Sequence, residues 1–143
     1  MKIAMGADHG GVALKAELAA RLVDQGHEVI DLGTHGPDGV DYPDYAHAVA
    51  DLVVSGGADR GILVCGTGQG MAMAANKVPG VRAGVVSDTF SATMIAEHND
   101  AKILCLGARV VGPGLAAAIV DSYMGASFAG GRHARRVGKI EPA

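Results

Sequence analysis

The sequence predicts an α/β fold, a three-layer, doubly wound (Rossmann-like) arrangement around a five-stranded parallel sheet. Five short apolar runs alternate with longer segments of helical periodicity along the 143 residues, as in parallel strands joined by crossover helices. The third to fifth runs show little polar alternation, as is usual for strands covered on both faces. With 49% hydrophobic residues, a chain of this length can bury a core as a single domain over residues 1–143.

The first half of the chain predicts two strands, each followed by a helix. KIAMGA, residues 2–7, is the first strand, and residues 12–26 place leucines at helical spacing before a glycine ends the helix. HEVIDLG, residues 27–33, is the second strand, and residues 41–55 form a helix that begins near an extended Tyr-Pro pair.

The second half repeats the pattern. The predicted strands are RGILVC (60–65), VRAGVVS (81–87) and AKILCLG (101–107). GTGQG opens a helix after the first of these, a Ser-Asp pair suited to capping begins another, and a third follows Gly-Pro-Gly at residues 112–114. The basic tail predicts a short terminal helix over about 130–142.

Composition argues against several functional classes. A net charge of −3 gives no sign of binding to polyanions or membrane surfaces, and 3% aromatic residues without Trp make a base-stacking surface improbable. No apolar run approaches the ~18 residues of a membrane span. Cys65 and Cys105 form no Cys-x-x-Cys pair, so we expect two free thiols in a reducing cytoplasm. The expected partner is a small molecule, not nucleic acid or membrane.

Ligands of doubly wound sheets collect where the strands end, near the point at which strand order reverses. Candidate residues are therefore those directly after each predicted strand, together with one histidine at a helix end: Asp8 and His9, 31–35, 65–70, 87–88, 107–109 and His98.

The loop GTGQG is the first of these candidates to suggest chemistry. Gly66, Gly68 and Gly70 expose a row of backbone amides at the start of a helix, which favours an anion or a developing oxyanion. The spacing is neither the dinucleotide-binding G-x-G-x-x-G nor a P-loop. Taken alone, the loop is equally consistent with a plain tight turn.

Cys65 stands at the junction of the third strand and this loop. An unpaired cysteine on a strand is more often a small buried hydrophobe than a reagent. Its position beside exposed amides favours the thiolate, the form that acts as a base or nucleophile. Cys105 has no such loop behind it and is predicted to be structural.

Three further motifs carry polar groups. ADHGG places Asp8 and His9 at the end of the first strand, where a general acid or base would lie. His98 can serve chemistry or simply end a helix. Arg132 and Arg136 share one helix face and could clamp a phosphate, although a solvated basic tail is the alternative. The histidine and cysteine spacings form no metal-ligand set, so no metal is predicted.

Together the motifs resemble the type B ribose-5-phosphate isomerases, a family that includes galactose-6-phosphate and allose-6-phosphate isomerases. ADHGG, DYPDYA, CGTGQG with AANK, EHND, LGARVVG and GGRHARRV occur in the family's order over nearly the whole chain. Each motif is weak alone and the set is highly specific. The resemblance implies a homodimer that uses no metal or cofactor, and it leaves dimer and tetramer open as alternatives. Residues of both subunits complete each site, and the terminal helix can cross to the partner.

The resemblance also implies a reaction and its residues. Ribose 5-phosphate and ribulose 5-phosphate interconvert through a cis-enediolate in the pentose phosphate pathway, and Cys65 shuttles the proton between C1 and C2. Thr67 and the loop amides hold the enediolate oxygens, while Asp8 and His98 assist ring opening and hydroxyl proton transfers. The implied substrate-binding residues are His9, Tyr42, Gly66, Gly68, Gly70, Asn99, Arg109, Arg132 and Arg136. Relatives without the cysteine carry a glutamate where this chain has Met71.

Other functions remain open from the sequence. Another aldose phosphate, such as allose 6-phosphate, could be the substrate of the same isomerase. A non-catalytic nucleotide- or phosphate-binding module would use the glycine loop as a cradle and leave Cys65 buried. A catalytically silent dimeric interaction protein is a third possibility. The presence of all the matched site residues argues against it.

Overall fold

The computed structural model describes residues 1–142, in which strands and helices alternate up to the fifth strand and two helices follow it. Residue 143, the last of the predicted domain, lies outside the described residues. The elements are β1 (Lys2–Ala7), α1 (Val12–Asp24), β2 (Glu28–Asp31), α2 (Tyr42–Val54), β3 (Arg60–Cys65), α3 (Gln69–Ala75), β4 (Ala83–Val85), α4 (Thr89–Glu97), β5 (Ile103–Gly107), α5 (Pro113–Met124) and α6 (Arg132–Gly138).

The five strands form one sheet in the order β2-β1-β3-β5-β4, and every neighbouring pair is parallel. The predicted doubly wound α/β fold is confirmed. From β1 the chain first adds β2 on one side and later β3 on the other, so strand order reverses between β1 and β3. A ligand is expected at the carboxyl ends of these two strands.

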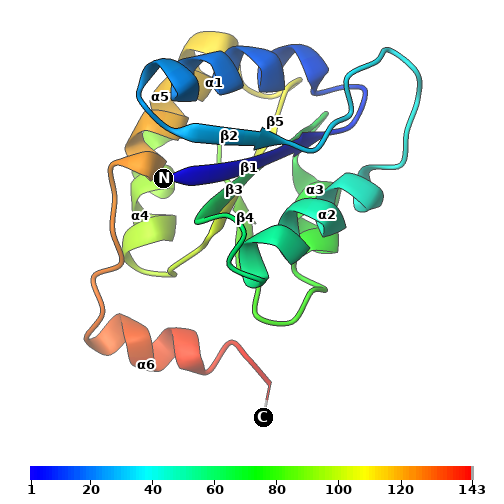
Figure 1. Ribbon diagram of the computed structural model, residues 1–143. Coiled ribbons are helices and arrows are strands. Elements are labelled where there is room, and N and C mark those ends of the chain that lie inside the picture. Colours follow the sequence, from blue (N-terminus) through cyan, green and yellow to red (C-terminus); the bar gives the residue numbers. More distant parts are fainter. Residues whose placement is uncertain (143) are drawn as a thin grey trace.

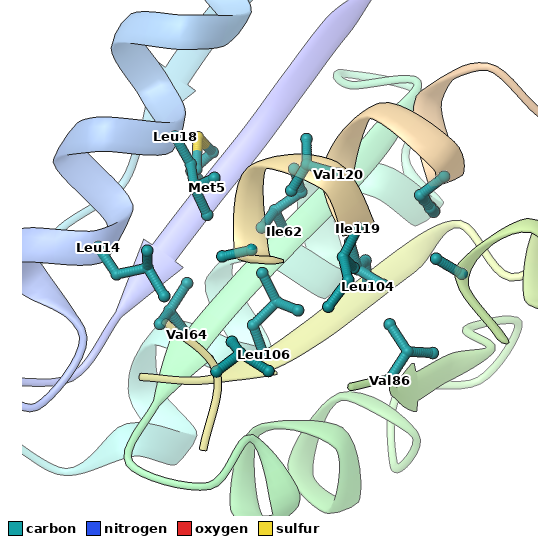
Figure 2. Packing of buried hydrophobic residues seen from close by; sticks show 14 of the residues in the cluster. Met5, Leu14, Leu18, Ile62, Val64, Val86, Leu104, Leu106, Ile119 and Val120 are labelled. Carbon is teal, nitrogen blue, oxygen red and sulfur yellow. The ribbon is translucent and has the colours of Figure 1, made fainter. Parts of the chain in front are cut away.

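Helices cover both faces of the sheet (Figure 1). Apolar side chains of α1, α4 and α5 pack on one face, and those of α2 and α3 pack on the other. Figure 2 shows the first of these layers, where Leu14 and Leu18 of α1 and Ile119 and Val120 of α5 contact the sheet over Ile62. Burial of this layer stabilises the fold, because each fully buried side chain of this size contributes about 1.5–3 kcal/mol.

The predicted second and fourth strands are shorter than expected. Residues 27–33 form a strand only over Glu28–Asp31, and residues 81–87 only over Ala83–Val85. Both strands lie at the edges of the sheet and pair on one side only, so fewer of their residues join the hydrogen-bond ladder. The interior strands match the prediction more closely.

The terminal helix α6 stands apart from the sheet, joined to α5 by an extended segment (Figure 1). Only Val137 of its seven residues is buried. Within residues 1–142, every helix is too short or too polar to cross a bilayer.

Candidate active site

A hollow of about 300 Å³ lies at the reversal point of strand order. Its walls come from the ends of three strands and the start of α2: Asp8, His9, Gly10, Tyr42, Cys65, Gly66, Thr67, Gly70 and Arg109. The structure therefore brings together the residues predicted after β1, β3 and β5, with Tyr42. We call this cavity the cysteine hollow.

Cys65 is the last residue of β3 and only 5% exposed, yet it lines the cysteine hollow. The backbone amide of Gly68 donates a hydrogen bond to its sulfur at 3.0 Å. An N–H aimed at sulfur stabilises negative charge there. The thiol therefore points toward the glycine turn, in agreement with its predicted place beside exposed amides.

Cys105, by contrast, is fully buried within β5. Loss of water around its thiol, with a smaller contribution from nearby Cys65, raises the pKa of Cys105 above its ordinary range. A neutral, inaccessible thiol behaves as a small hydrophobe, in agreement with the predicted structural role.

Close backbone contact holds the loop after β3 in place. Gly68 has φ +80°, and a Cβ on it would come 3.0 Å from the carbonyl carbon of Leu106. A Cβ on Gly107 would come 2.7 Å from the carbonyl oxygen of Thr67. Glycine is required at both positions because only a side chain of one hydrogen leaves room for the two backbones. The loop thus rests directly on the end of β5.

The remaining groups surround the sulfur from neighbouring loops. The Gly10 amide donates to Asp8 Oδ1 at 2.9 Å, which fixes the half-buried carboxylate in the hollow. The Val40 amide donates to His9 Nδ1 at 3.3 Å. His9 and Arg109 are both exposed at the rim, where they could meet an anionic group of a bound molecule.

A second hollow, of about 340 Å³, lies beside α6 and is lined by His98, Asn99, His133, Arg136, Val137 and Ile140. The rings of His98 and His133 stack with centroids 4.1 Å apart and planes inclined by 8°. Desolvation, with the charges of His98, Arg132 and Arg136, lowers the pKa of His133. We call this cavity the histidine hollow; it is cationic and suited to an anion.

The two hollows lie at opposite ends of the strands, the cysteine hollow at their carboxyl ends and the histidine hollow on the side of their amino ends. Cys65 pairs with Gly107 at the carboxyl end of β5, whereas His98 caps the end of α4, the helix that leads back to the beginning of β5. The five residues of β5 alone span ~13 Å. One chain therefore does not bring His98, Asn99 and Arg136 to the sulfur, and Arg132, the first residue of α6, lines neither hollow.

Two other candidate carboxylates have structural partners. Asp31 forms an ion pair with Lys15, which is only 1% exposed, and accepts a hydrogen bond from the Gly33 amide. Asp88 caps α4 by accepting from the Ser91 amide at 2.6 Å, and this hydrogen bond lowers the pKa of Asp88. Neither residue lines the cysteine hollow.

Sequence reasoning missed His133, whose ring stacks on His98. The residue lies within GGRHARRV, where the two arginines give the stronger signal. It also missed Arg82, whose guanidinium donates to the Asn99 carbonyl at 3.0 Å. A lone arginine before a strand gives no sequence signal of such a contact.

A larger hollow, of about 550 Å³, is neither of these two. It lies between the segment after α3 and the C-terminal tail, and its walls include Val78, Val81, Ile95 and Ile140. Of the predicted site residues only Asn99 reaches it, so size alone does not identify the reactive site. Across residues 1–142 we find no group of three His, Cys, Asp or Glu side chains placed to hold a metal ion.

Comparison with known proteins gives a consistent result. The profile of the family described as Ribose/Galactose Isomerase matches residues 3–140. Ribose-5-phosphate isomerase B of Escherichia coli K12 is 52% identical over 139 residues, which cover 97% of this chain and 93% of that protein.

Solved structures agree as well. Ribose-5-phosphate isomerase B of Clostridium thermocellum superposes with a TM-score of 0.97 at 59% identity, covering 98% of this chain and 95% of that one. The Mycoplasma genitalium enzyme, solved with bound ribulose 5-phosphate, has a TM-score of 0.94 at 43% identity and covers 97% and 93% of the respective chains.

Proposed function

Because this chain belongs to the ribose/galactose isomerase family, we propose that it interconverts ribose 5-phosphate and ribulose 5-phosphate, with Cys65 as the base. The observation that carries the proposal is the Gly68 amide at 3.0 Å from the Cys65 sulfur, inside a hollow of sugar size. A relative solved with ribulose 5-phosphate, 43% identical to this chain, supports the choice of substrate.

The reaction moves one proton between adjacent carbons. The Cys65 thiolate takes the proton from C2 of the open-chain aldose, the electron pair passes to the C1 carbonyl oxygen, and the proton then returns to C1. Between the two steps the substrate is an enediolate, whose oxygens need preorganised donors. The hydroxyl of Thr67 and the amides of Gly66 and Gly70 are proposed as these donors, whereas the Gly68 amide, predicted with them, is directed at the Cys65 sulfur instead. One such donor can be worth about 3 kcal/mol.

Polar groups around the carbons serve the hydroxyl protons. Asp8 faces the hollow beside Cys65 and is proposed to move a proton between O1 and O2. Tyr42, at the mouth of the same hollow, is proposed to bind the sugar. His9 and Arg109, exposed at the rim, are proposed to bind the phosphate.

A second subunit is proposed to complete each site. His98 and Asn99 lie at the opposite end of the strands from Cys65. The three side chains of one chain therefore cannot contact the same small sugar. In a two-fold dimer, each cysteine hollow can face the partner's histidine hollow, and both sites form at once. His98 then opens the sugar ring, Asn99 binds the sugar, and Arg132 and Arg136 of α6 bind the phosphate. Pairs of such dimers would give a tetramer.

We also propose a cytoplasmic location and a role in the pentose phosphate pathway. Both cysteines are free and buried, as suits a reducing compartment, and the proposed base must remain a reduced thiol to work.

Solvent exchange tests the proposed base directly. With ribose 5-phosphate in deuterated water, the wild-type protein should exchange the C2 hydrogen at a rate that chelators leave unchanged. Cys65→Ala should abolish exchange, whereas Cys105→Ala, the matched control at the other cysteine, should retain it. Full turnover by Cys65→Ala would show that another group is the base.

A substrate panel tests the choice of sugar. Ribose 5-phosphate should give the highest kcat/KM among four- to six-carbon aldose phosphates. A preference for allose 6-phosphate would keep the chemistry and change the substrate. A tightly bound nucleotide or flavin without any isomerase activity would instead favour a binding module.

A further inference from the structure

One arginine holds the turn that carries His98 and Asn99. Arg82, directly before β4, donates from Nε to the Asn99 carbonyl oxygen at 3.0 Å and from Nη2 to the Asp100 carbonyl oxygen at 3.1 Å. The same Nη2 lies 3.2 Å from the Asp100 carboxylate. The side chain is 18% exposed, so these bonds are largely shielded from water.

The turn needs such support because its backbone is unfavourable on its own. Asp100 has φ +48°, the only positive φ of a non-glycine residue in the part of the chain that the structure describes. A left-handed residue of this kind is unfavourable by itself and persists where its surroundings hold it. Arg82 holds both carbonyls of the turn, and Lys102 holds only the Asp100 carboxylate, at 2.8 Å.

The turn is continuous with the histidine hollow. His98 is the C-cap of α4, and its amide donates to the Met94 carbonyl at 2.8 Å. Asn99, the first residue that Arg82 holds, therefore directly follows His98 in the chain. Arg82 Nη1 also reaches Glu141 Oε1 at 3.4 Å, which ties the same guanidinium to the segment that follows α6.

We propose that Arg82 is a positioning residue of the isomerase: it fixes the 98–100 turn so that His98 and Asn99 meet the closed sugar ring in the partner's cysteine hollow. The inference rests on the proposed function, because it assigns ring opening to His98. Arg82 lines the hollow of about 550 Å³ but neither the cysteine hollow nor the histidine hollow, so the proposed role is exerted through the turn. The planar fork places Nε against the Asn99 carbonyl and Nη2 against the Asp100 carbonyl at the same time, a geometry that the flexible point charge of a lysine ammonium does not reproduce.

The two sugars of the reaction allow ring opening to be measured separately from proton transfer at the Cys65 sulfur. Ribose 5-phosphate is mainly a closed ring, so its turnover needs ring opening. Ribulose 5-phosphate is an open chain, because the hydroxyl that would close a five-membered ring carries the phosphate. Exchange of its C1 hydrogen with solvent needs the thiolate and the loop amides, and no ring opening.

The experiment compares both measurements at saturating substrate for the wild-type protein, Arg82→Ala and Arg82→Lys. Arg82→Ala should lower kcat with ribose 5-phosphate about 10- to 100-fold, while C1 exchange of ribulose 5-phosphate changes less than about threefold. Arg82→Lys keeps the charge and loses the fork, so its kcat should lie between the other two. Lys102→Ala, which removes only an ion pair to the Asp100 carboxylate, should stay within about twofold of wild type in both assays.

Each outcome decides between the readings. Because misfolding of Arg82→Ala lowers both rates by the same factor, the ratio of the ribose 5-phosphate kcat to the ribulose 5-phosphate exchange rate is the measure of positioning. A wild-type ratio in both Arg82→Ala and Arg82→Lys would overturn the positioning role. Unchanged turnover of ribose 5-phosphate in Arg82→Ala and Arg82→Lys would overturn it too. If wild-type protein exchanged neither sugar, the proposed function itself would fail, a result distinct from either of these.

Discussion

The Gly68 amide lies 3.0 Å from the Cys65 sulfur, so the end of β3 and the turn behind it act as one chemical unit. Because the turn depends on a left-handed glycine pressed against Leu106, the position of this donor is fixed before substrate binds. The donor therefore need not reorganise during the reaction.

Replacing that glycine should impair both folding and turnover. In Gly68→Ala the φ of +80° becomes unfavourable and the new methyl meets the Leu106 backbone. We expect a loss of ~1 kcal/mol or more in the free energy of unfolding and a fall in kcat of about 100-fold. Urea unfolding and steady-state kinetics measure the two effects. Gly114→Ala, within α5 and with its new methyl group in open space, is the control that should lower neither quantity. Wild-type kcat in Gly68→Ala would show that the amide does not assist the sulfur.

Mixing two inactive variants should restore activity if each site spans two subunits. Cys65→Ala and His98→Asn disable different hollows. After co-refolding, half of the dimers are hybrids with one intact site, so about a quarter of the wild-type rate should return. Cys65→Ala mixed with Asp8→Asn is the control: both residues line the cysteine hollow, and no recovery is expected. Absence of recovery in the first mixture as well would argue that one chain forms the whole site.

Tyr123 should matter for stability through its hydroxyl. The group is buried and donates to the Ala101 carbonyl oxygen at 2.6 Å, while Arg60 stacks on the ring with its guanidinium carbon 4.7 Å from the centroid. Tyr123→Phe leaves that buried carbonyl without its donor and should reduce the free energy of unfolding by about 1–3 kcal/mol. Tyr42→Phe, at a side chain 41% exposed, should change it by less than ~0.5 kcal/mol. Equal unfolding midpoints for all three proteins would contradict this assignment.

The stacked histidines should make stability depend on pH. The folded structure lowers the pKa of His133 from its ordinary 6.5, through desolvation and the nearby charges of His98, Arg132 and Arg136. The unfolded chain then binds more protons, so this contribution is complete above the unfolded pKa and is lost as pH falls from there toward the folded value.

His133→Asn should therefore flatten the slope of unfolding free energy against pH on the acid side of 6.5. Urea titrations at several pH values measure that slope. His47→Asn, at an exposed position of α2, serves as the matched control and should keep the wild-type slope. An unchanged slope in His133→Asn would show that the stack does not resist protonation.

The fold was largely predictable because its local signals agree. β1 and β3 match the predicted ranges, since buried parallel strands give uninterrupted apolar runs and glycines mark their ends. The edge strands were overestimated because their pairing on one side is a tertiary property. The order of the strands, and therefore the point at which it reverses, could not be predicted from one sequence. It depends on which strands pair, and a single sequence does not show that.

The cysteine hollow was also predictable, because residues that follow parallel strands meet at one edge. His98 follows a helix instead of a strand, so the same rule does not predict its position. The structure places His98 at the end of α4, away from the carboxyl ends of the strands. The contacts of His133 and Arg82 depend on how α6 and the 98–100 turn fold back on the body of the domain. Such contacts join residues distant in sequence and leave no periodic pattern.

The opposite placement of Cys65 and His98 has a kinetic consequence under the proposed function. An isolated chain carries a cysteine hollow and a histidine hollow that cannot serve the same sugar, so it has no complete active site. Catalysis therefore becomes second order in protein concentration once dilution separates the subunits. Specific activity should then fall as the preparation is diluted below the dissociation constant, and the cellular abundance of the chain would set how much of it can work at all.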